Sequence, residues 1–166
     1  AGMGDGGACH PRDNIALRYL SHKLELGYDM FEGIMLSREE QARNLALRLV
    51  ELAYDNKIPI VIHGKAYKPR VSYIEGSYSL LVGHFCKELA PNVELFYVDK
   101  CTGDTYDSKK PAVFLLAHSA TTTYRYWDNP DSDELYCEIP EGSIVVDPWR
   151  KFTSDTLKVI HYGNTR

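Results

Sequence analysis

The sequence predicts an α/β protein in which a helical N-terminal segment is followed by a mostly parallel sheet with helices on both faces. Apolar residues recur at helical spacing through the first third of the chain, and after residue 56 they change to short continuous apolar runs bounded by turn residues. Such runs are typical of parallel strands, because a strand covered on both sides buries all of its side chains.

Helical spacing predicts three elements in the first third of the chain. Residues 13–26 form the first helix, and a short helical stretch covers 29–36. Ser37 with Glu40 three residues later gives a capping box, which predicts that a helix over 37–55 begins there. The long apolar stripe of this third helix must be covered, either by another part of the protein or by a second copy of the chain.

Five apolar runs predict the strands of the sheet, with a helix between the first two. Ligands of parallel sheets bind beyond the carboxyl ends of the strands. The residues at or just after the ends of the predicted strands are polar and include His63, Lys65, Asp99, His118 and Asp147, so we expect a site at this edge. The predicted strands are 58–63, 94–98, 112–117, 143–146 and 157–162, and the predicted helix is 77–89.

Composition excludes several classes of protein. The 166 residues carry a net charge of −4 with lysines and arginines scattered among acids, so we expect no nucleic-acid partner. Neither a run of bilayer length nor a secretory signal is visible, which predicts a cytoplasmic protein without a membrane partner. The four cysteines form no C-x-x-C pair, so we expect neither zinc nor disulfides. Since the chain begins at Ala1, almost on its most informative motif, we expect an upstream part to be missing.

That motif is Gly-Gly-Ala-Cys-His-Pro-Arg-Asp at positions 6–13. A thiol reacts as its thiolate, and a position just before a helix N-terminus favours an anion there. Pro11 and Asp13 suit a first helical turn. The pattern predicts that Cys9 is a nucleophile, with a small buried apolar role as the alternative.

A second motif, Gly-Lys-Ala-Tyr-Lys-Pro at positions 64–69, directly follows the first predicted strand. Lys65 and Lys68 can reach a phosphate as point charges, and the helix that opens near Ser77 adds backbone N–H donors. Solvated surface lysines are the alternative. The glycines within residues 2–7 do not form a dinucleotide fingerprint, because no strand precedes them and their spacing is wrong.

Together with the strand ending in Val-Val-Asp at 145–147, these motifs resemble the UDP-glucose/GDP-mannose dehydrogenase family over essentially the whole chain. The resemblance implies a catalytic-cysteine loop and central helices over 1–56, with a homodimer formed through the helix 37–55. It implies a Rossmann-like UDP-sugar-binding domain over 57–166. The NAD-binding domain of the family, which precedes the cysteine, is missing from this sequence.

The activity implied by the resemblance is an NAD-dependent oxidation of a nucleotide sugar at C6, of the UDP-glucose to UDP-glucuronate type. Cys9 would be the nucleophile that carries the thiohemiacetal and the thioester, and Asp13 would position water and transfer protons. NAD would bind mainly to the missing domain, so we expect the isolated chain to bind nucleotide sugar without turnover. The implied substrate-binding residues are Gly4, Gly6, Gly7, Lys65, Tyr67 and Lys68.

The chain departs from the family pattern at several positions, which concerns the substrate more than the fold. His10 stands in place of an aromatic residue, and Arg12 in place of a lysine. Two other interpretations stay open. One is a stand-alone nucleotide-binding module, and the other is a cysteine hydrolase or transferase in which His10, His63 or His118 serves Cys9.

Overall fold

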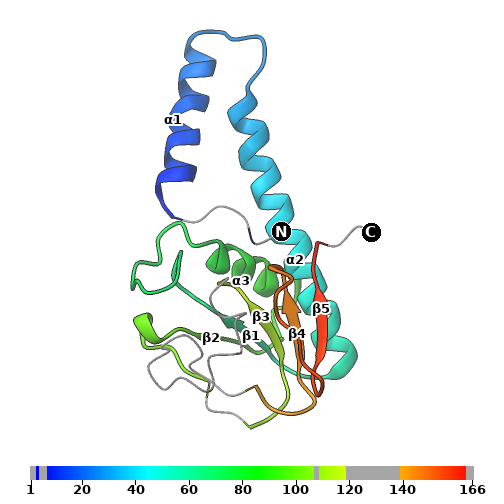
Figure 1. Ribbon diagram of the computed structural model, residues 1–166. Coiled ribbons are helices and arrows are strands. Elements are labelled where there is room, and N and C mark those ends of the chain that lie inside the picture. The colour runs from blue at the N-terminus through cyan, green and yellow to red at the C-terminus, as the bar shows by residue number, and fades with distance from the viewer. Residues whose placement is uncertain (1–2, 4–6, 107–108, 119–138, 164–166) are drawn as a thin grey trace.

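The computed structural model describes residue 3 and residues 7–106, 109–118 and 139–163. Two helices form a hairpin at the start, and a five-stranded sheet with one further helix follows (Figure 1). The elements are α1 (Cys9–Lys23), α2 (Met30–Asn56), β1 (Ile60–His63), α3 (Tyr78–Leu89), β2 (Leu95–Val98), the short 3-10 helix η1 (Lys100–Thr102), β3 (Val113–Leu116), β4 (Ile144–Asp147) and β5 (Lys158–His161).

The sheet has the strand order β2-β1-β3-β4-β5, and every neighbouring pair is parallel. In the centre, Ile60 lies opposite both Leu95 and Val113. The predicted α/β class with a parallel sheet is confirmed. Each predicted run contains its observed strand, except that β4 is shifted by one residue and includes Asp147.

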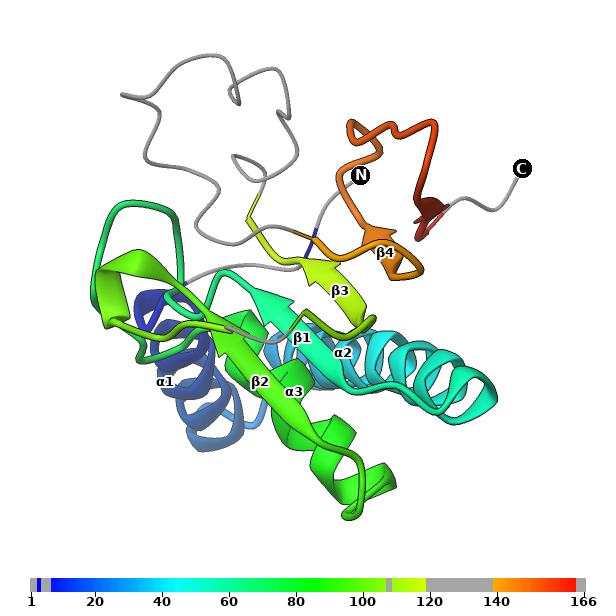
Figure 2. The same ribbon diagram turned by 90° about the horizontal axis from the view of Figure 1, so that it is seen from below.

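The two faces of the sheet are covered differently. Ile62 and Leu115 belong to a core that includes α2 and α3, whereas Val61 and Phe114 point to the opposite face. There the strands pack against residues of the connecting loops, such as Phe152. Figure 2 shows α2 and α3 on the same side of the sheet. Within the described residues, the helices that cover the sheet therefore lie on one face.

The helical segment differs from the prediction. The separate helices expected over 29–36 and 37–55 are one continuous helix, α2, so the capping box predicted at Ser37 is wrong. The physical reason is an earlier cap: Asp29 Oδ1 accepts hydrogen bonds from the backbone N–H groups of Phe31 (3.0 Å) and Glu32 (3.1 Å). The first helix begins at Cys9 and ends at Lys23, so Cys9 lies inside its first turn.

The apolar stripe of 37–55 is buried within the chain, since Ala42, Leu45 and Leu49 pack in the core with α3 and the sheet. By contrast, α1 buries only two residues, Asn14 and Ser21, and both are polar. No helix in the described ranges has the length and apolar character needed to cross a bilayer. The division of the chain at residues 56 and 57 stays a prediction. Large apolar side chains exposed on the hairpin include Ile15, Tyr19, Leu20, Leu24, Leu26, Tyr28, Met30 and Leu36.

Candidate functional site

The turn that precedes Cys9 packs on the loop between β1 and α3; we call residues 7–9 the cysteine turn and residues 64–77 the β1–α3 loop. Gly7 is buried, and a Cβ atom placed on it would lie 3.0 Å from Cδ2 of Tyr67. A Cβ atom on Gly76 would lie 2.5 Å from the carbonyl carbon of Gly7 and 2.6 Å from the nitrogen of Ala8. Only glycines permit this contact, which joins segments about sixty residues apart in the sequence.

Three reactive or charged side chains share the first turn of α1. Cys9 is exposed. The Arg12 Nε donates to Asp13 Oδ1 at 2.8 Å, and this hydrogen bond holds the pKa of the Asp13 carboxyl below its ordinary value. The pKa of Arg12 is raised, first by Asp13 and also by a negative charge on Cys9, because the guanidinium lies beside the thiol. The turn thus presents an accessible thiol next to a cation and an ionised carboxylate.

Hydrogen bonds and packing contacts connect the carboxyl ends of three adjacent strands beside this turn. Asp99, directly after β2, accepts hydrogen bonds at its Oδ2 from the backbone N–H groups of Lys65 (2.9 Å) and Ala66 (2.8 Å). The His118 ring, after β3, packs on Gly64, and its Nε2 lies 2.8 Å from the carbonyl oxygen of Ala66. These contacts fix the start of the β1–α3 loop.

The two lysines of that loop have different surroundings. Lys65 Nζ lies 3.0 Å and 2.8 Å from the two carboxylate oxygens of Asp104. Burial alone would raise the pKa of Asp104, but hydrogen bonds from Lys65 and Thr102 hold it below its ordinary value. Lys68 is exposed, and its Nζ lies 5.2 Å from the ring centroid of Tyr67. Lys65 therefore belongs to an internal ion pair, whereas Lys68 faces solvent.

This architecture matches solved structures. A GDP-mannose dehydrogenase from Pseudomonas aeruginosa, solved as a ternary complex, matches 95% of this chain with a TM-score of 0.63 and 17% identity. A UDP-D-ManNAc dehydrogenase from Pyrococcus horikoshii matches 96% (TM-score 0.62, 18% identity), and a UDP-glucose dehydrogenase from Pyrobaculum islandicum matches 89% (TM-score 0.60, 19% identity). A scan against models of protein families and a search of curated proteins give no match.

The chain has the fold of nucleotide-sugar dehydrogenases. It spans 40%, 39% and 35% of the length of these three structures. The resemblance inferred from the sequence motifs is therefore confirmed at the level of the fold, whereas the roles of individual residues stay predictions.

The predicted site residues of this dehydrogenase-like fold are partly brought together. Gly7, two residues before Cys9, lies next to Tyr67 and is joined to the loop that carries Lys68. Lys65 is turned into its ion pair with Asp104. Gly4 and Gly6 lie outside the described residues, as does Cys137.

Each of the three histidines considered as partners of Cys9 is either hydrogen-bonded elsewhere or buried. The Asn14 amide donates to the His10 carbonyl oxygen at 2.8 Å and lies 3.3 Å from His10 Nδ1, so a neutral His10 carries its proton on Nε2. His118 is bonded to Ala66, and His63 is only 3% exposed. This arrangement weighs against a cysteine hydrolase that uses one of them as its base.

Because His63 is buried, we expect the stability of the fold to depend on pH. Burial first, and the neighbouring His118 second, lower its pKa to about 4. An unfolded histidine takes up a proton below about pH 6.5, so the free energy of unfolding should fall as the pH drops from about 6.5 towards 4, by at most about 1.4 kcal/mol per unit. In the described part of the chain both His63 ring nitrogens lack hydrogen-bond partners. His63→Leu should therefore raise the free energy of unfolding by about 1–2 kcal/mol at pH 7, and urea titrations should show a weaker dependence of this free energy on pH.

The matched control is His84→Gln, because His84 is exposed on α3. It should keep the pH dependence of the unsubstituted chain. If the free energy of unfolding of His63→Leu depends on pH as strongly as that of the unsubstituted chain, His63 is not held neutral in the folded state.

An open groove of about 460 Å³ runs along the hairpin. Arg38 lines it, donates to the carbonyl oxygen of Gly76 at 3.4 Å and lies over the Tyr78 ring at 5.6 Å. The groove therefore adjoins the β1–α3 loop. Its other lining residues are His10, Tyr28, Met30, Gly33, Ile34, Ser37 and Gln41.

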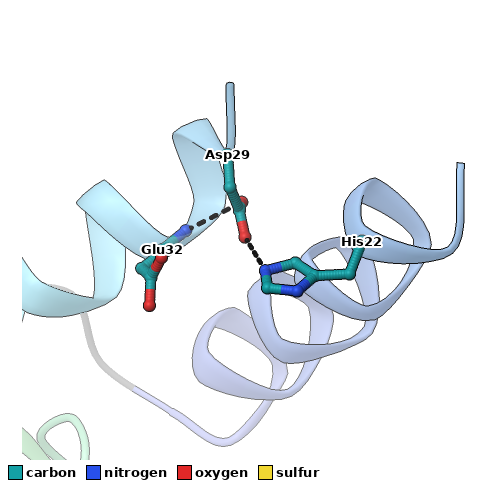
Figure 3. Close-up of side chains that lie close together, drawn as sticks. All are labelled: His22, Asp29 and Glu32. Carbon is teal, nitrogen blue, oxygen red and sulfur yellow. Dashed lines mark hydrogen bonds and ion pairs between the residues drawn. The ribbon is translucent and has the colours of Figure 1, made fainter. Parts of the chain in front are cut away.

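His22, Asp29 and Glu32, where the hairpin turns, are the group of described side chains close enough to share a cation (Figure 3). His22 Nε2 lies 3.1 Å from Asp29 Oδ2, and Asp29 already caps α2. Arg18 Nη2 lies 2.6 Å from Glu32 Oε1, so one carboxylate of the cluster is already paired with a guanidinium. We interpret these residues as an ion-pair network that holds α1 against α2.

Proposed function

We propose that this chain is part of an NAD-dependent nucleotide-sugar 6-dehydrogenase of the UDP-glucose to UDP-glucuronate type, and that it binds the nucleotide sugar and supplies the catalytic thiol. The observation that carries the proposal is the packing of the cysteine turn on the β1–α3 loop. It joins exposed Cys9 to the loop of Lys68, at the carboxyl edge of a parallel sheet, where ligands of such folds bind. The shared fold supports this assignment.

The covalent chemistry is assigned to Cys9. Its thiolate adds to the carbonyl carbon of an aldehyde-level substrate, and the carbonyl oxygen becomes an oxyanion. After oxidation at that carbon has given a thioester, water attacks the acyl carbon, the carboxylate forms, and sulfur leaves as thiolate. To Asp13, ionised and one helical turn from Cys9, we assign the role of orienting that water and accepting its proton.

NAD, which accepts the electrons in this reaction, does not fit the residues of this chain. The sequence holds no glycine fingerprint that follows a strand and opens a helix. The cofactor site is therefore assigned to a part of the protein outside this sequence, and the catalytic cycle needs both parts.

The test of substrate binding is a thermal shift with UDP-glucose and UDP. A ligand at one hundred times its dissociation constant stabilises the fold by about 2.7 kcal/mol, so Tm should rise by about 5–10 °C. Lys68→Ala removes a charge-assisted contact to phosphate and should weaken binding about tenfold or more. The matched control, Lys158→Ala, removes an exposed lysine at the opposite end of the sheet and should leave binding unchanged.

Absence of any shift with UDP would refute the proposed function. If UDP binds, the full-length protein distinguishes our proposal from a stand-alone nucleotide-binding module. Such a module would show no dehydrogenase activity, with or without Cys9→Ser. Our proposal expects activity there and its loss in Cys9→Ser.

We also propose that the protein is cytoplasmic and self-associates. The stripe of 37–55 is buried within the chain, so the surface assigned to a second copy is the exposed apolar side of the hairpin, which includes Leu20 and Leu24. Light scattering should give a dimer, and the double substitution Leu20→Glu, Leu24→Glu should give a monomer with an unchanged Tm at low concentration. A monomer at high concentration before substitution would contradict this.

A further inference from the structure

We propose that Tyr67 is a positioning residue: its ring fixes the cysteine turn on the β1–α3 loop and thereby sets the distance between Cys9 and a phosphate held at Lys68. The part of this inference that concerns the phosphate rests on the proposed function. The part that concerns the turn does not, since it follows from contacts within the chain.

The cysteine turn is held at two points by one loop. A Cβ atom on Gly7 would lie 3.0 Å from Cδ2 and 3.2 Å from Cε2 of Tyr67, so Gly7 lies directly against the ring. Gly76, nine residues further along the same loop, lies against the backbone of Gly7 and Ala8. With the ring removed, the contact with Gly76 would remain, and the turn could pivot on it.

The ring is itself fixed from within the loop. The backbone N–H of Tyr67 donates to the carbonyl oxygen of Tyr73 at 3.2 Å, and the two rings meet edge to face with centroids 6.0 Å apart. The start of the loop is in turn bonded to Asp99. Tyr67 thus belongs to the rigid carboxyl edge of the sheet, and the turn of α1 is fitted against it.

Lys68 is the next residue, and its Nζ lies 5.2 Å from the centroid of the same ring. A phosphate bound by this ammonium would therefore be separated from the cysteine turn by one aromatic side chain. The atoms of Tyr67 that touch Gly7 are ring carbons. Phenylalanine should consequently serve as well as tyrosine for this contact. The variant Tyr67→Phe therefore distinguishes positioning by the ring from hydrogen bonding by the hydroxyl.

The first experiment measures amide hydrogen exchange in the ligand-free chain. The Arg12 N–H, bonded to the Ala8 carbonyl oxygen at 3.2 Å, reports on the first turn of α1. Tyr67→Ala should speed exchange in residues 7–13 about tenfold and leave β1 unchanged. Tyr67→Phe should exchange at the original rate, and so should the matched control Tyr54→Ala, because Tyr54 is exposed near the C-terminal end of α2. Equal rates in Tyr67→Ala and the unsubstituted chain would overturn the proposal.

If Tyr67→Ala also speeds exchange in β1, Tyr67→Leu takes its place, since leucine retains bulk without the ring. Faster exchange confined to residues 7–13 in that variant supports the assignment, and unchanged exchange there overturns it.

The second experiment adds UDP. Saturating UDP should slow exchange in residues 7–13 at least threefold in the unsubstituted chain and in Tyr67→Phe, but not in Tyr67→Ala. Binding without this protection would overturn the link between Lys68 and Cys9. Failure of UDP to bind at all would refute the proposed function, while the ligand-free comparison would still decide the role of Tyr67.

Discussion

Replacement of Asp147 by alanine is expected to lower the free energy of unfolding by about 3–6 kcal/mol, because it leaves three backbone N–H donors, one of them on buried Phe152, without their acceptor. The Asp147 carboxylate is fully buried. It accepts from the backbone N–H groups of Trp149 (2.8 Å), Lys151 (2.7 Å) and Phe152 (2.7 Å). Phe152 is a core residue on the loop-covered face of the sheet, so the loop and this part of the core should loosen together.

The measurement is urea unfolding of Asp147→Ala beside Asp147→Asn and Asp155→Ala. Asparagine retains one acceptor oxygen and should show an intermediate loss. Asp155 is an exposed carboxylate on the same connection, and its removal should change stability by less than about 0.5 kcal/mol. Equal stability of Asp147→Ala and Asp155→Ala would contradict the role given to the buried carboxylate.

Gly76→Ala is expected to cost about 2–5 kcal/mol and to displace the cysteine turn. Gly76 has a φ of +69°, which costs an L-residue roughly 1–2 kcal/mol. The added methyl would also lie 2.5 Å from the Gly7 carbonyl carbon, a backbone atom that cannot rotate away, and overpacking adds about 1–3 kcal/mol. At about 2–4 °C per kcal/mol, Tm should fall by roughly 4–20 °C.

Gly103→Ala separates the two causes. Gly103 has a φ of +75°, but nothing lies within 4 Å of the position of its Cβ atom. This control should therefore lose only the part due to backbone strain, about 1–2 kcal/mol. Hydrogen exchange in residues 7–13 should rise in Gly76→Ala and not in Gly103→Ala. Similar losses in both variants would mean that the contact with the cysteine turn contributes nothing to stability.

The strands of the sheet were predictable because each is marked by the residues of its own short segment. Continuous apolar runs such as Ile60–His63 and Val113–Leu116 are bounded by turn residues, and fully buried parallel strands require such runs. The start of α2 was not predictable in the same way. Ser37 has the spacing of a helix cap, but Asp29 caps the helix eight residues earlier, and no local rule ranks these two positions.

In the candidate site too, local contacts could be predicted from the sequence and long-range contacts could not. Cys9 and Asp13 lie within one helical turn, so their proximity follows from their spacing. The contact of Gly7 with Tyr67 joins residues sixty positions apart and depends on tertiary packing. Lys65 was expected to meet phosphate, but its partner in the structure is Asp104, 39 residues later. Long-range charge pairs of this kind leave no pattern in a single sequence.

The helix α1 gives two polar side chains, Asn14 and Ser21, to the interior and keeps its leucines outside. Selection on Leu20 and Leu24 therefore acts through whatever molecule or segment lies across that surface. In an alignment of orthologues, these leucines should covary with the opposing surface. Asn14 should instead vary together with His10, because its side-chain amide lies 3.3 Å from the ring Nδ1 of His10.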